Sequence, residues 1–518
     1  MNTKTYRLLT ILILATATSA AQVTLQPWTQ VYGTISWQRL GLFVMGIKPT
    51  TNLPYRVAIY SGGKTSFYRL QTPTDTTALL SLTGENAQIG DLNGDGFTDI
   101  VLRRIGNSPL YIDTVVIYWG MITGIDTITP TKLTGSNLQE DFGSSISIGN
   151  IIADSTPDLI VGAPQYFFGA FLGRVYIYKG GSLFLETPSV ILTGDSANFN
   201  LGINCAVGDI NNDGFNDLIA RGWYALGPDS VRFDYVDVWF GGVVFDTTRD
   251  MMMYSKYING SGLSCFDANG DGIADLLWTH RNSMLNDEIF VHFGKANFDT
   301  IPSLRLQNPG VANFGSTIIN AGDMNGDGYN DIAVAAFRAN ITSGFVFIFG
   351  GGPKIDGDFD AAVGMSSDAD FGYVVASVGD INSDGLSDVI VGAPSYAFGN
   401  EKGYWGIFIG DTAIHVTDVK NDISVPAVFK LFQSYPNPFN PKATIKYQLI
   451  ESAYITLEIF NMLGQRVKLL VDKYQVPGTY ESIFDGTQLS SGVYMYKLTA
   501  KTNKEDIYSN TKKLTLIK

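Results

Sequence analysis

Few charged residues, few cysteines and few histidines occur in this chain of 518 residues. Charged residues make up only 16% of it and hydrophobic residues 45%, a balance that excludes a largely disordered chain. Two cysteines, Cys205 and Cys265, are too few for a scaffold built on disulfides. Both lie in apolar runs, which favours two small core residues, and a single disulfide between neighbouring repeats is the open alternative.

Long apolar runs are also missing, so no transmembrane segment is expected. The N-terminus has the pattern of a secretory signal: Lys4 and Arg7 are positive, residues 8–15 are apolar, and residues 16–21 are small. We therefore expect residues 1–21 to be a signal peptide that is removed on export. The formal net charge of −14 and the pI of about 4.7 argue against nucleic acid and anionic membranes as partners.

Glycine and aromatic residues are plentiful, with 56 glycines and 12% aromatic residues. This composition is typical of many short strands joined by tight turns, and it predicts an all-β fold.

An acidic loop of nine residues recurs along the chain at intervals of 56 to 59 residues, which indicates a repeat architecture. Five copies are well formed: DLNGDGFTD from Asp91, DINNDGFND from Asp209, DANGDGIAD from Asp267, DMNGDGYND from Asp323 and DINSDGLSD from Asp380. A degenerate copy, NIIADSTPD, starts at Asn150.

A second repeated feature is an alternating apolar strand that ends in glycine. Its seven copies span residues 57–63, 115–121, 175–181, 236–242, 289–295, 345–351 and 405–411. Four short strands per repeat and seven repeats predict a seven-bladed β-propeller over residues 22–417. The first blade, about residues 33–63, keeps its strands but has lost the acidic loop. We expect residues 23–27 to close the ring beside residues 403–410, with residues 412–416 as the competing strand.

Two repeats are nearly complete copies of a known pattern: FGSSISIGN…PDLIVGAP at 142–164 and FGYVVASVGDINSDGLSDVIVGAP at 371–394. They resemble the FG-GAP repeats of the integrin α-chain propeller. The resemblance covers about three-quarters of the chain and implies the propeller fold, with calcium sites of structural role at one end of the blades. Similar repeats occur in secreted bacterial proteins of unrelated function, so the resemblance does not imply a particular ligand.

The acidic loops have the ligand types that calcium prefers, which are hard oxygens at alternate positions. Positions 1, 3, 5 and 9 carry carboxylate or amide groups, position 7 would offer its backbone carbonyl, and position 6 is glycine in all five loops. The predicted ligands of about five structural Ca²⁺ sites are Asp91, Asn93, Asp95, Phe97, Asp99, Asp209, Asn211, Asp213, Phe215, Asp217, Asp267, Asn269, Asp271, Ile273, Asp275, Asp323, Asn325, Asp327, Tyr329, Asp331, Asp380, Asn382, Asp384, Leu386 and Asp388.

The loops differ from two other kinds of acidic loop. An EF-hand needs a glutamate at position 12, where all five loops have an apolar residue, and a dockerin-like helical loop fails the same test. A metal-free turn of Asp and Asn residues would explain one loop, but five in register favour calcium. The copy at Asn150 has Ile152 at position 3 and Ser155 in place of glycine, so we expect it to bind no ion.

The C-terminal ninety residues are different. A polar stretch, residues 418–428, reads as a linker, and residues 429–518 alternate as strands of a small Ig-like β-sandwich. The runs YPNPFNP (435–441), FNMLGQ (460–465) and SSGVYMYKL (490–498) resemble the type A C-terminal sorting domain of type IX secretion substrates. One departure is Phe484, where the family often has tryptophan. The resemblance implies the type IX machinery as a partner and a secreted or outer-surface location in a Gram-negative bacterium.

No catalytic constellation is evident, so the chain is interpreted as a binding protein and not an enzyme. The loops after the second strands should emerge opposite the calcium loops, and they are rich in arginine and aromatic residues, which dominate recognition surfaces. Their candidate ligand-binding residues are Arg103, Arg104, Tyr166, Phe167, Phe168, Trp223, Tyr224, His280, Arg338, Tyr396 and Phe398; the alternative is that individual members only pack between blades.

The leading hypothesis is a calcium-binding adhesion module for an extracellular protein or glycan. A carbohydrate-active enzyme, such as a polysaccharide lyase, on the same face is the second, and a purely structural envelope component is the third.

Overall fold

The computed structural model describes residues 23–517 except 26, 33–42, 48–49, 51–55, 74–76, 107–111, 137–139, 153, 155, 165–171, 196–199, 226–231, 256–261, 284–285, 341–342, 366–369, 395–402, 415–429, 450–452, 476–477 and 503–506. The chain separates into two compact units, residues 1–417 and 418–518. Each unit is described by itself. The predicted signal peptide (1–21) and linker (418–428) lie outside the described residues.

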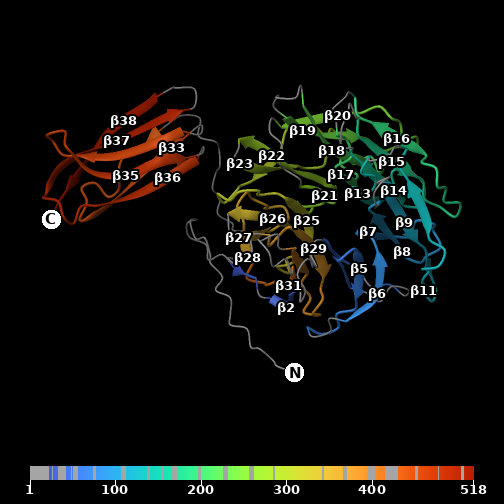
Figure 1. Cartoon of the computed structure of the whole chain (residues 1–518). Coiled ribbons are helices and arrows are strands. Elements are labelled where there is room, and N and C mark those ends of the chain that lie inside the picture. The colour runs from blue at the N-terminus through green and yellow to red at the C-terminus, as the bar shows by residue number, and fades with distance from the viewer. Residues whose placement is uncertain are drawn as a thin grey trace. The chain divides into compact units, whose positions relative to one another are not determined.

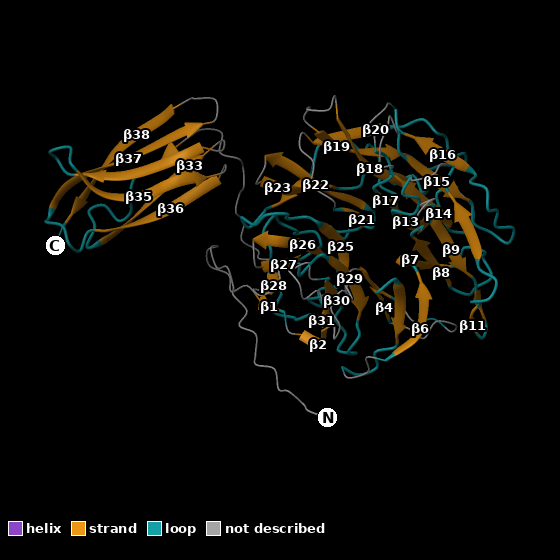
Figure 2. Ribbon diagram, in the orientation of Figure 1, coloured by secondary structure: helices purple, strands orange, loops and turns teal. Residues whose placement is uncertain are grey.

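The all-β prediction is confirmed, because every regular element of the described residues is a β-strand (Figure 2). The central strands of the first unit are continuous apolar runs, such as residues 100–102, which are fully buried. A strand whose two faces are both covered by neighbouring sheets needs apolar side chains on both faces, and a continuous run provides them.

Among the described residues, seven sheets with four antiparallel strands each form most of the first unit, and we number them in chain order. Sheet 1 contains β3 (Phe43–Gly46), β4 (Val57–Ser61), β5 (Lys64–Tyr68) and β6 (Ala78–Thr83). Sheet 2 contains β7 (Glu85–Gly90), β8 (Asp99–Arg104), β9 (Thr114–Tyr118) and β12 (Thr131–Thr134), with a small ribbon of β10 (Gly120–Met121) and β11 (Gly124–Ile125) beside it. Sheet 3 contains β13 (Ser145–Gly149), β14 (Asp158–Ala163), β15 (Arg174–Tyr178) and β16 (Val190–Thr193).

The remaining sheets follow the same order of strands. Sheet 4 contains β17 (Asn204–Gly208), β18 (Asp217–Ala225), β19 (Arg232–Trp239) and β20 (Met251–Ser255). Sheet 5 contains β21 (Leu263–Phe266), β22 (Asp275–Ser283), β23 (Asn286–His292) and β24 (Leu304–Leu306). Sheet 6 contains β25 (Thr317–Gly322), β26 (Asp331–Asn340), β27 (Ser343–Phe349) and β28 (Ala361–Met365), and sheet 7 contains β29 (Val374–Gly379), β30 (Asp388–Ala393), β31 (Tyr404–Phe408) and β2 (Pro27–Tyr32).

The seven sheets are arranged in a closed cycle (Figure 1). The first strand of each sheet packs beside the first strand of the next sheet, and β29 of sheet 7 packs beside β3 of sheet 1. Apolar clusters fill the space between neighbouring sheets, for example between sheets 2 and 3, where Phe142 and Tyr176 meet edge to face. Sheets stacked around an axis in this way are the blades of a β-propeller.

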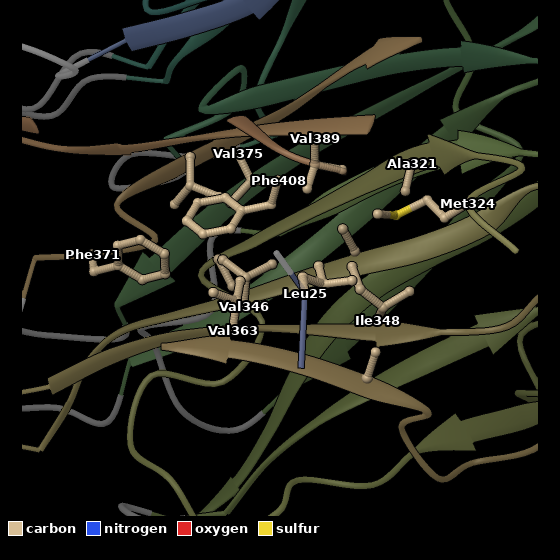
Figure 3. Close-up of a cluster of buried hydrophobic side chains, with 14 of the residues drawn as sticks. Leu25, Ala321, Met324, Val346, Ile348, Val363, Phe371, Val375, Val389 and Phe408 are labelled. Carbon is tan, nitrogen blue, oxygen red and sulfur yellow. The ribbon is translucent and has the colours of Figure 1, made fainter. Parts of the chain in front are cut away.

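The N-terminal segment closes the ring, but not with the predicted strand. Residues 23–27 are predicted beside residues 403–410, but of the described ones only Pro27 lies there, paired with Phe408, whereas β1 (Val23–Thr24) pairs in parallel with β28 of sheet 6. The strand that completes sheet 7 is β2, which pairs antiparallel with β31. Between β1 and β2, Leu25 is 1% exposed and packs into the apolar cluster between sheets 6 and 7 (Figure 3).

The first repeat also differs from its prediction. The run at 57–63 resembles the third-strand runs of the other repeats, but β4 is the second strand of its sheet and β5 is the third. Sheet 1 therefore extends from Phe43 to Thr83 and not over residues 33–63. The apolar pattern of this second strand is like that of the third strands elsewhere because second and third strands are both buried between neighbouring sheets.

The second unit is a sandwich of two sheets. One contains β32 (Lys430–Leu431), β33 (Lys442–Leu449) and β36 (Gly478–Asp485), and the other β34 (Ala453–Phe460), β35 (Arg466–Gln475), β37 (Gly492–Thr502) and β38 (Ile507–Leu516). Its apolar core is a separate cluster made of residues 431–516. Phe484, the departure from tryptophan, is fully buried there and lies 5.5 Å from Phe439 between ring centroids.

Candidate metal centres

Each acidic loop joins the first and second strands of its sheet. Position 1 follows the first strand, and position 9 is the first residue of the second strand, as Asp99 is of β8 and Asp331 of β26. The structure therefore places the five predicted loops at equivalent positions of sheets 2, 4, 5, 6 and 7, and the degenerate copy in sheet 3.

The carboxylate at position 9 is completely buried in all five loops. In sheet 2, Asp99 accepts a hydrogen bond from Leu92 N at 2.8 Å and another from Gly120 N, after the third strand, at 2.7 Å. The other four loops repeat both bonds. One carboxylate thus joins the loop, the second strand and the end of the third strand.

Burial gives this carboxylate an unusual pKa. It raises the pKa of Asp99, Asp217 and Asp331 to about 7, and that of Asp275 and Asp388 to about 6, although hydrogen bonds from backbone N–H groups act in the opposite direction. The negative charges at position 5 contribute to the rise in each loop. A carboxylate penalised by burial and by its neighbours is favoured in its charged form by a nearby cation.

Positions 1, 3 and 5 hold the loop in a tight wrap. In sheet 6, Asp323 accepts hydrogen bonds from the N–H groups of Gly326 and Gly328 at 2.6 and 2.9 Å. Asn325 Oδ1 accepts one from Asp327 N at 2.8 Å, and Asp327 Oδ1 accepts one from Tyr329 N at 3.0 Å. The glycine at position 6 has φ between 85 and 94° in the five loops, which is the left-handed region that glycine adopts without strain.

Sequence reasoning missed a second left-handed position in the same loops. Position 4 also has positive φ, and it is glycine in three loops but Asn212 (φ 57°) and Ser383 (φ 65°) in the other two. Asparagine is one of the few residues that adopt this region readily. The signal was in the sequence, in the glycine that precedes Asp95, Asp271 and Asp327.

The loops are also bonded from one sheet to the next, which the sequence did not reveal. The carbonyl oxygen of position 1 accepts a hydrogen bond from position 8 of the following loop: Ala274 N donates to Asp209 O at 3.2 Å, and Ser387 N to Asp323 O at 2.7 Å. At the join of the ring, the Arg56 guanidinium of sheet 1 donates to Asp380 O at 3.0 Å. A change in one loop therefore acts on two sheets.

The donor set of these loops fits calcium in its chemistry. The side-chain donors are oxygens of Asp and Asn, the hard ligands that Ca²⁺ takes. Among the described residues, no three side chains of Asp, Glu, His or Cys converge as a ready-made metal cluster. The carboxylates accept backbone N–H bonds, and a carboxylate oxygen keeps further lone pairs when it accepts one. The predicted calcium ligands, all of them described, thus lie on one short loop in each sheet without converging on a common point, and their role stays a prediction.

The loop of sheet 3 keeps the frame of the others. Asp158 at position 9 is buried and accepts hydrogen bonds from Ile151 N and Gly180 N. At position 5, however, Asp154 Oδ2 lies 3.1 Å from the Lys179 ammonium. Ile152 takes the place of an oxygen ligand at position 3.

The candidate ligand-binding residues opposite the calcium loops do not form one site in the described residues. Tyr166, Phe167, Phe168, Tyr396 and Phe398 lie outside those residues, and the side chain of Tyr224 is not described. Trp223 of sheet 4 is partly buried.

The other four candidates contact their own or neighbouring sheets. Arg103 pairs with Asp113 at 2.5 Å, Arg104 donates to Thr83 O at 3.1 Å, and Arg338 pairs with Asp370 at 2.7 Å. His280 stacks on Phe290 at 4.1 Å, and burial, with the charge of Arg305, lowers its pKa to about 4. Their role in ligand binding stays a prediction.

A buried ion pair within sheet 4, whose arginine also bonds to sheet 5, was also missed. Arg221 is 1% exposed, lies 2.9 Å from Asp234 Oδ2, and donates to the carbonyl oxygens of Gly262 and Thr279 in sheet 5. Nothing in the run DLIARGWY distinguishes this arginine from a solvent-exposed one.

Substituting Arg221→Met is expected to destabilise the propeller by about 3–5 kcal/mol, because it removes one member of a buried ion pair and two hydrogen bonds to carbonyl oxygens of sheet 5. Denaturant unfolding of the two proteins measures the difference. Lys295→Met, which removes the exposed pair of Lys295 with Asp299, is the matched control and should leave the unfolding midpoint unchanged. Equal midpoints for Arg221→Met and the parent would contradict the role of Arg221 in joining sheets 4 and 5.

Within the part of the chain that the structure describes, no helix is long and apolar enough to cross a membrane. Comparison with known families finds matches in both units of the chain. Residues 142–178 and 371–404, in sheets 3 and 7, match the FG-GAP repeat, and residues 433–514 match the secretion system C-terminal sorting domain. The chain thus contains FG-GAP repeats of a β-propeller and a type IX sorting domain, and the recognition from sequence is confirmed.

Curated relatives resemble the propeller part. Integrin alpha-PS5 of Drosophila melanogaster is 25% identical over 309 residues, which is 54% of this chain and 30% of the relative. Phosphatidylinositol-glycan-specific phospholipase D of Dictyostelium discoideum is 27% identical over 229 residues, 39% of this chain and 23% of the relative. Integrin alpha-4 of Xenopus laevis is 32% identical over 146 residues, 26% and 14% of the two chains. The matched regions span less than a third of the length of these relatives.

Proposed function

We propose that this chain is a calcium-binding propeller that acts as an adhesion module outside the cell, where it binds a protein or glycan. Its sorting domain implies secretion or surface attachment. The observation that carries the proposal is the union of two parts in one chain: a closed ring with five equivalent acidic loops, and a separate sandwich that matches a sorting domain.

Calcium has a structural role in this proposal. Five ions would change the formal net charge of the chain from −14 to about −4 and would neutralise carboxylates that are packed within single loops. Each ion would be held by the side chains at positions 1, 3, 5 and 9 and the carbonyl at position 7. The loops lie at the same end of their strands, so the ions would stabilise one end of the ring and leave the opposite loops for binding.

The second candidate is an enzyme that uses those opposite loops. Phosphatidylinositol-glycan-specific phospholipases D of two organisms align with 39% of this chain. This similarity supports a hydrolytic enzyme as a candidate, beside the carbohydrate-active enzyme inferred from sequence. A structural envelope component without a soluble ligand is the third.

Two assays on the purified exported protein separate these functions. We expect the protein to bind defined members of a glycan or extracellular-protein array in calcium, to lose binding in chelator, and to leave polysaccharide chain lengths unchanged. Shortened polysaccharides, measured by size-exclusion chromatography, would favour the enzyme. Binding to no array member would favour the structural component.

A further inference from the structure

Lys179 is charged, whereas the equivalent residues of the other sheets with an acidic loop are not. It directly precedes the glycine whose N–H donates to the position-9 carboxylate. In sheets 2, 4, 5, 6 and 7 the residue before that glycine is uncharged: Trp119, Phe240, Phe293, Gly350 and Ile409. A cation is therefore present at this place in one sheet, and that sheet is the one with the degenerate loop.

The ammonium lies where it can replace an ion. Lys179 Nζ is 3.1 Å from Asp154 Oδ2, and Asp154 is the position-5 carboxylate, which the other loops offer as a predicted calcium ligand. The rest of the frame is intact, because Asp158 makes the same two backbone bonds as its equivalents. Asp154 also accepts a hydrogen bond from Thr156 N at 2.9 Å, as Asp327 does from Tyr329 N in sheet 6.

We propose that Lys179 is the built-in cation of sheet 3: its ammonium pairs with the position-5 carboxylate and opposes calcium binding there, in addition to the missing ligand at position 3. The inference rests on the proposed calcium binding of the other five loops. Two features then decide whether a loop binds calcium: the loop ligands, and the residue before the glycine that donates to the position-9 carboxylate. The loop has lost the Asn ligand of position 3 and the glycine of position 6, and Lys179 pairs with the carboxylate that remains at position 5.

The test repairs the loop of sheet 3 in two backgrounds. The substitutions Asn150→Asp, Ile152→Asn and Ser155→Gly introduce the residue types of the five good loops at positions 1, 3 and 6. Combined with Lys179→Phe, which is the residue type at this place in sheets 4 and 5, they should raise the calcium count by one ion per chain. With Lys179 retained, the added site should bind at least about tenfold more weakly, because a unit positive charge lies close to a divalent ion. Equilibrium dialysis with calcium measures both.

The reciprocal variant is Phe240→Lys in sheet 4, where the loop is well formed. It should lose one calcium ion per chain, or bind it at least about tenfold more weakly. A third measurement needs no calcium: in chelator, Lys179→Met should speed amide exchange of Gly180 by about threefold, as expected for loss of a half-exposed ion pair. Lys295→Met should leave that exchange unchanged.

The outcomes separate this inference from the proposed function. A parent protein that binds no calcium overturns the calcium proposal. A parent that binds calcium, together with equal affinities of the repaired loop with lysine or phenylalanine, or full calcium binding by Phe240→Lys, overturns the role of Lys179.

Discussion

Chelation of calcium is expected to lower the melting temperature of the exported propeller by about 10 °C. Extracellular calcium modules bind with dissociation constants of about 10⁻⁴ to 10⁻³ M. At a tenfold excess of calcium, each site contributes about 1.4 kcal/mol, and five sites contribute about 7 kcal/mol. That free energy is comparable to the whole net stability of a domain, and in a ring of this size it corresponds to roughly this change in melting temperature.

Two substitutions test which loops are loaded. Asp327→Ala removes a position-5 carboxylate from a complete loop, so it should reduce the calcium count by one and the calcium-dependent gain by about 1.4 kcal/mol. Asp154→Ala is the matched control: it also removes a position-5 carboxylate that accepts a backbone N–H, but from the loop of sheet 3. It should change neither the count nor the response to calcium.

Calorimetry with and without chelator, and calcium dialysis, measure these effects. The isolated sandwich serves as the negative control, because its core contains no residue of the ring and no acidic loop of this type. Equal calcium losses from the two variants would show that the loaded loops are misassigned. An unchanged melting temperature in chelator would refute the calcium proposal.

Deletion of residues 429–518 is expected to abolish delivery of the protein to the cell surface and medium and to leave a folded propeller in the periplasm. The deleted residues contain the sorting domain match, and their apolar core is separate from those of the seven sheets. The ring should therefore fold without them. Immunoblots of periplasm, outer membrane and medium in the native host measure the distribution.

A gain-of-function control accompanies the deletion. A signal peptide and residues 429–518 fused to a periplasmic reporter should carry the reporter out of the cell. Normal surface levels of the truncated chain would refute the sorting assignment. Protease resistance of the trapped propeller, compared with the full chain, verifies that the loss reflects transport and not unfolding.

The sequence predicted what local chemistry controls. The glycine at position 6 and the carboxylates at alternate positions indicate the geometry of a single loop. The period of nearly sixty residues indicates that one structural unit is repeated. The structure accordingly places Asp99 and its four equivalents alike, each at the start of a second strand.

What the sequence did not predict depends on neighbours distant in the chain. β1 and β2 pair with strands of sheets 6 and 7, more than three hundred residues away. Nothing in their short sequences indicates which strand each of them pairs with. The strand at 57–61 has the apolar letters of a third strand, and only its pairing shows it to be a second. Arg221 and Lys179 belong to no recognisable sequence motif, and their roles become visible only because the fold places Asp234 and Asp154 beside them.

The hydrogen bonds between successive loops give the ring a mechanical property that a linear array of repeats lacks. An open array frays from its terminal repeats, because each of these has one neighbour. Here every repeat has two neighbours: Arg56 of the first sheet bonds to Asp380 of the last, and β2 fastens the beginning of the chain to its seventh sheet. The ring therefore has no terminal repeat at which unfolding can start. We expect it to resist pulling forces and proteases as one cooperative unit, and to unfold in all seven blades together once one of them opens.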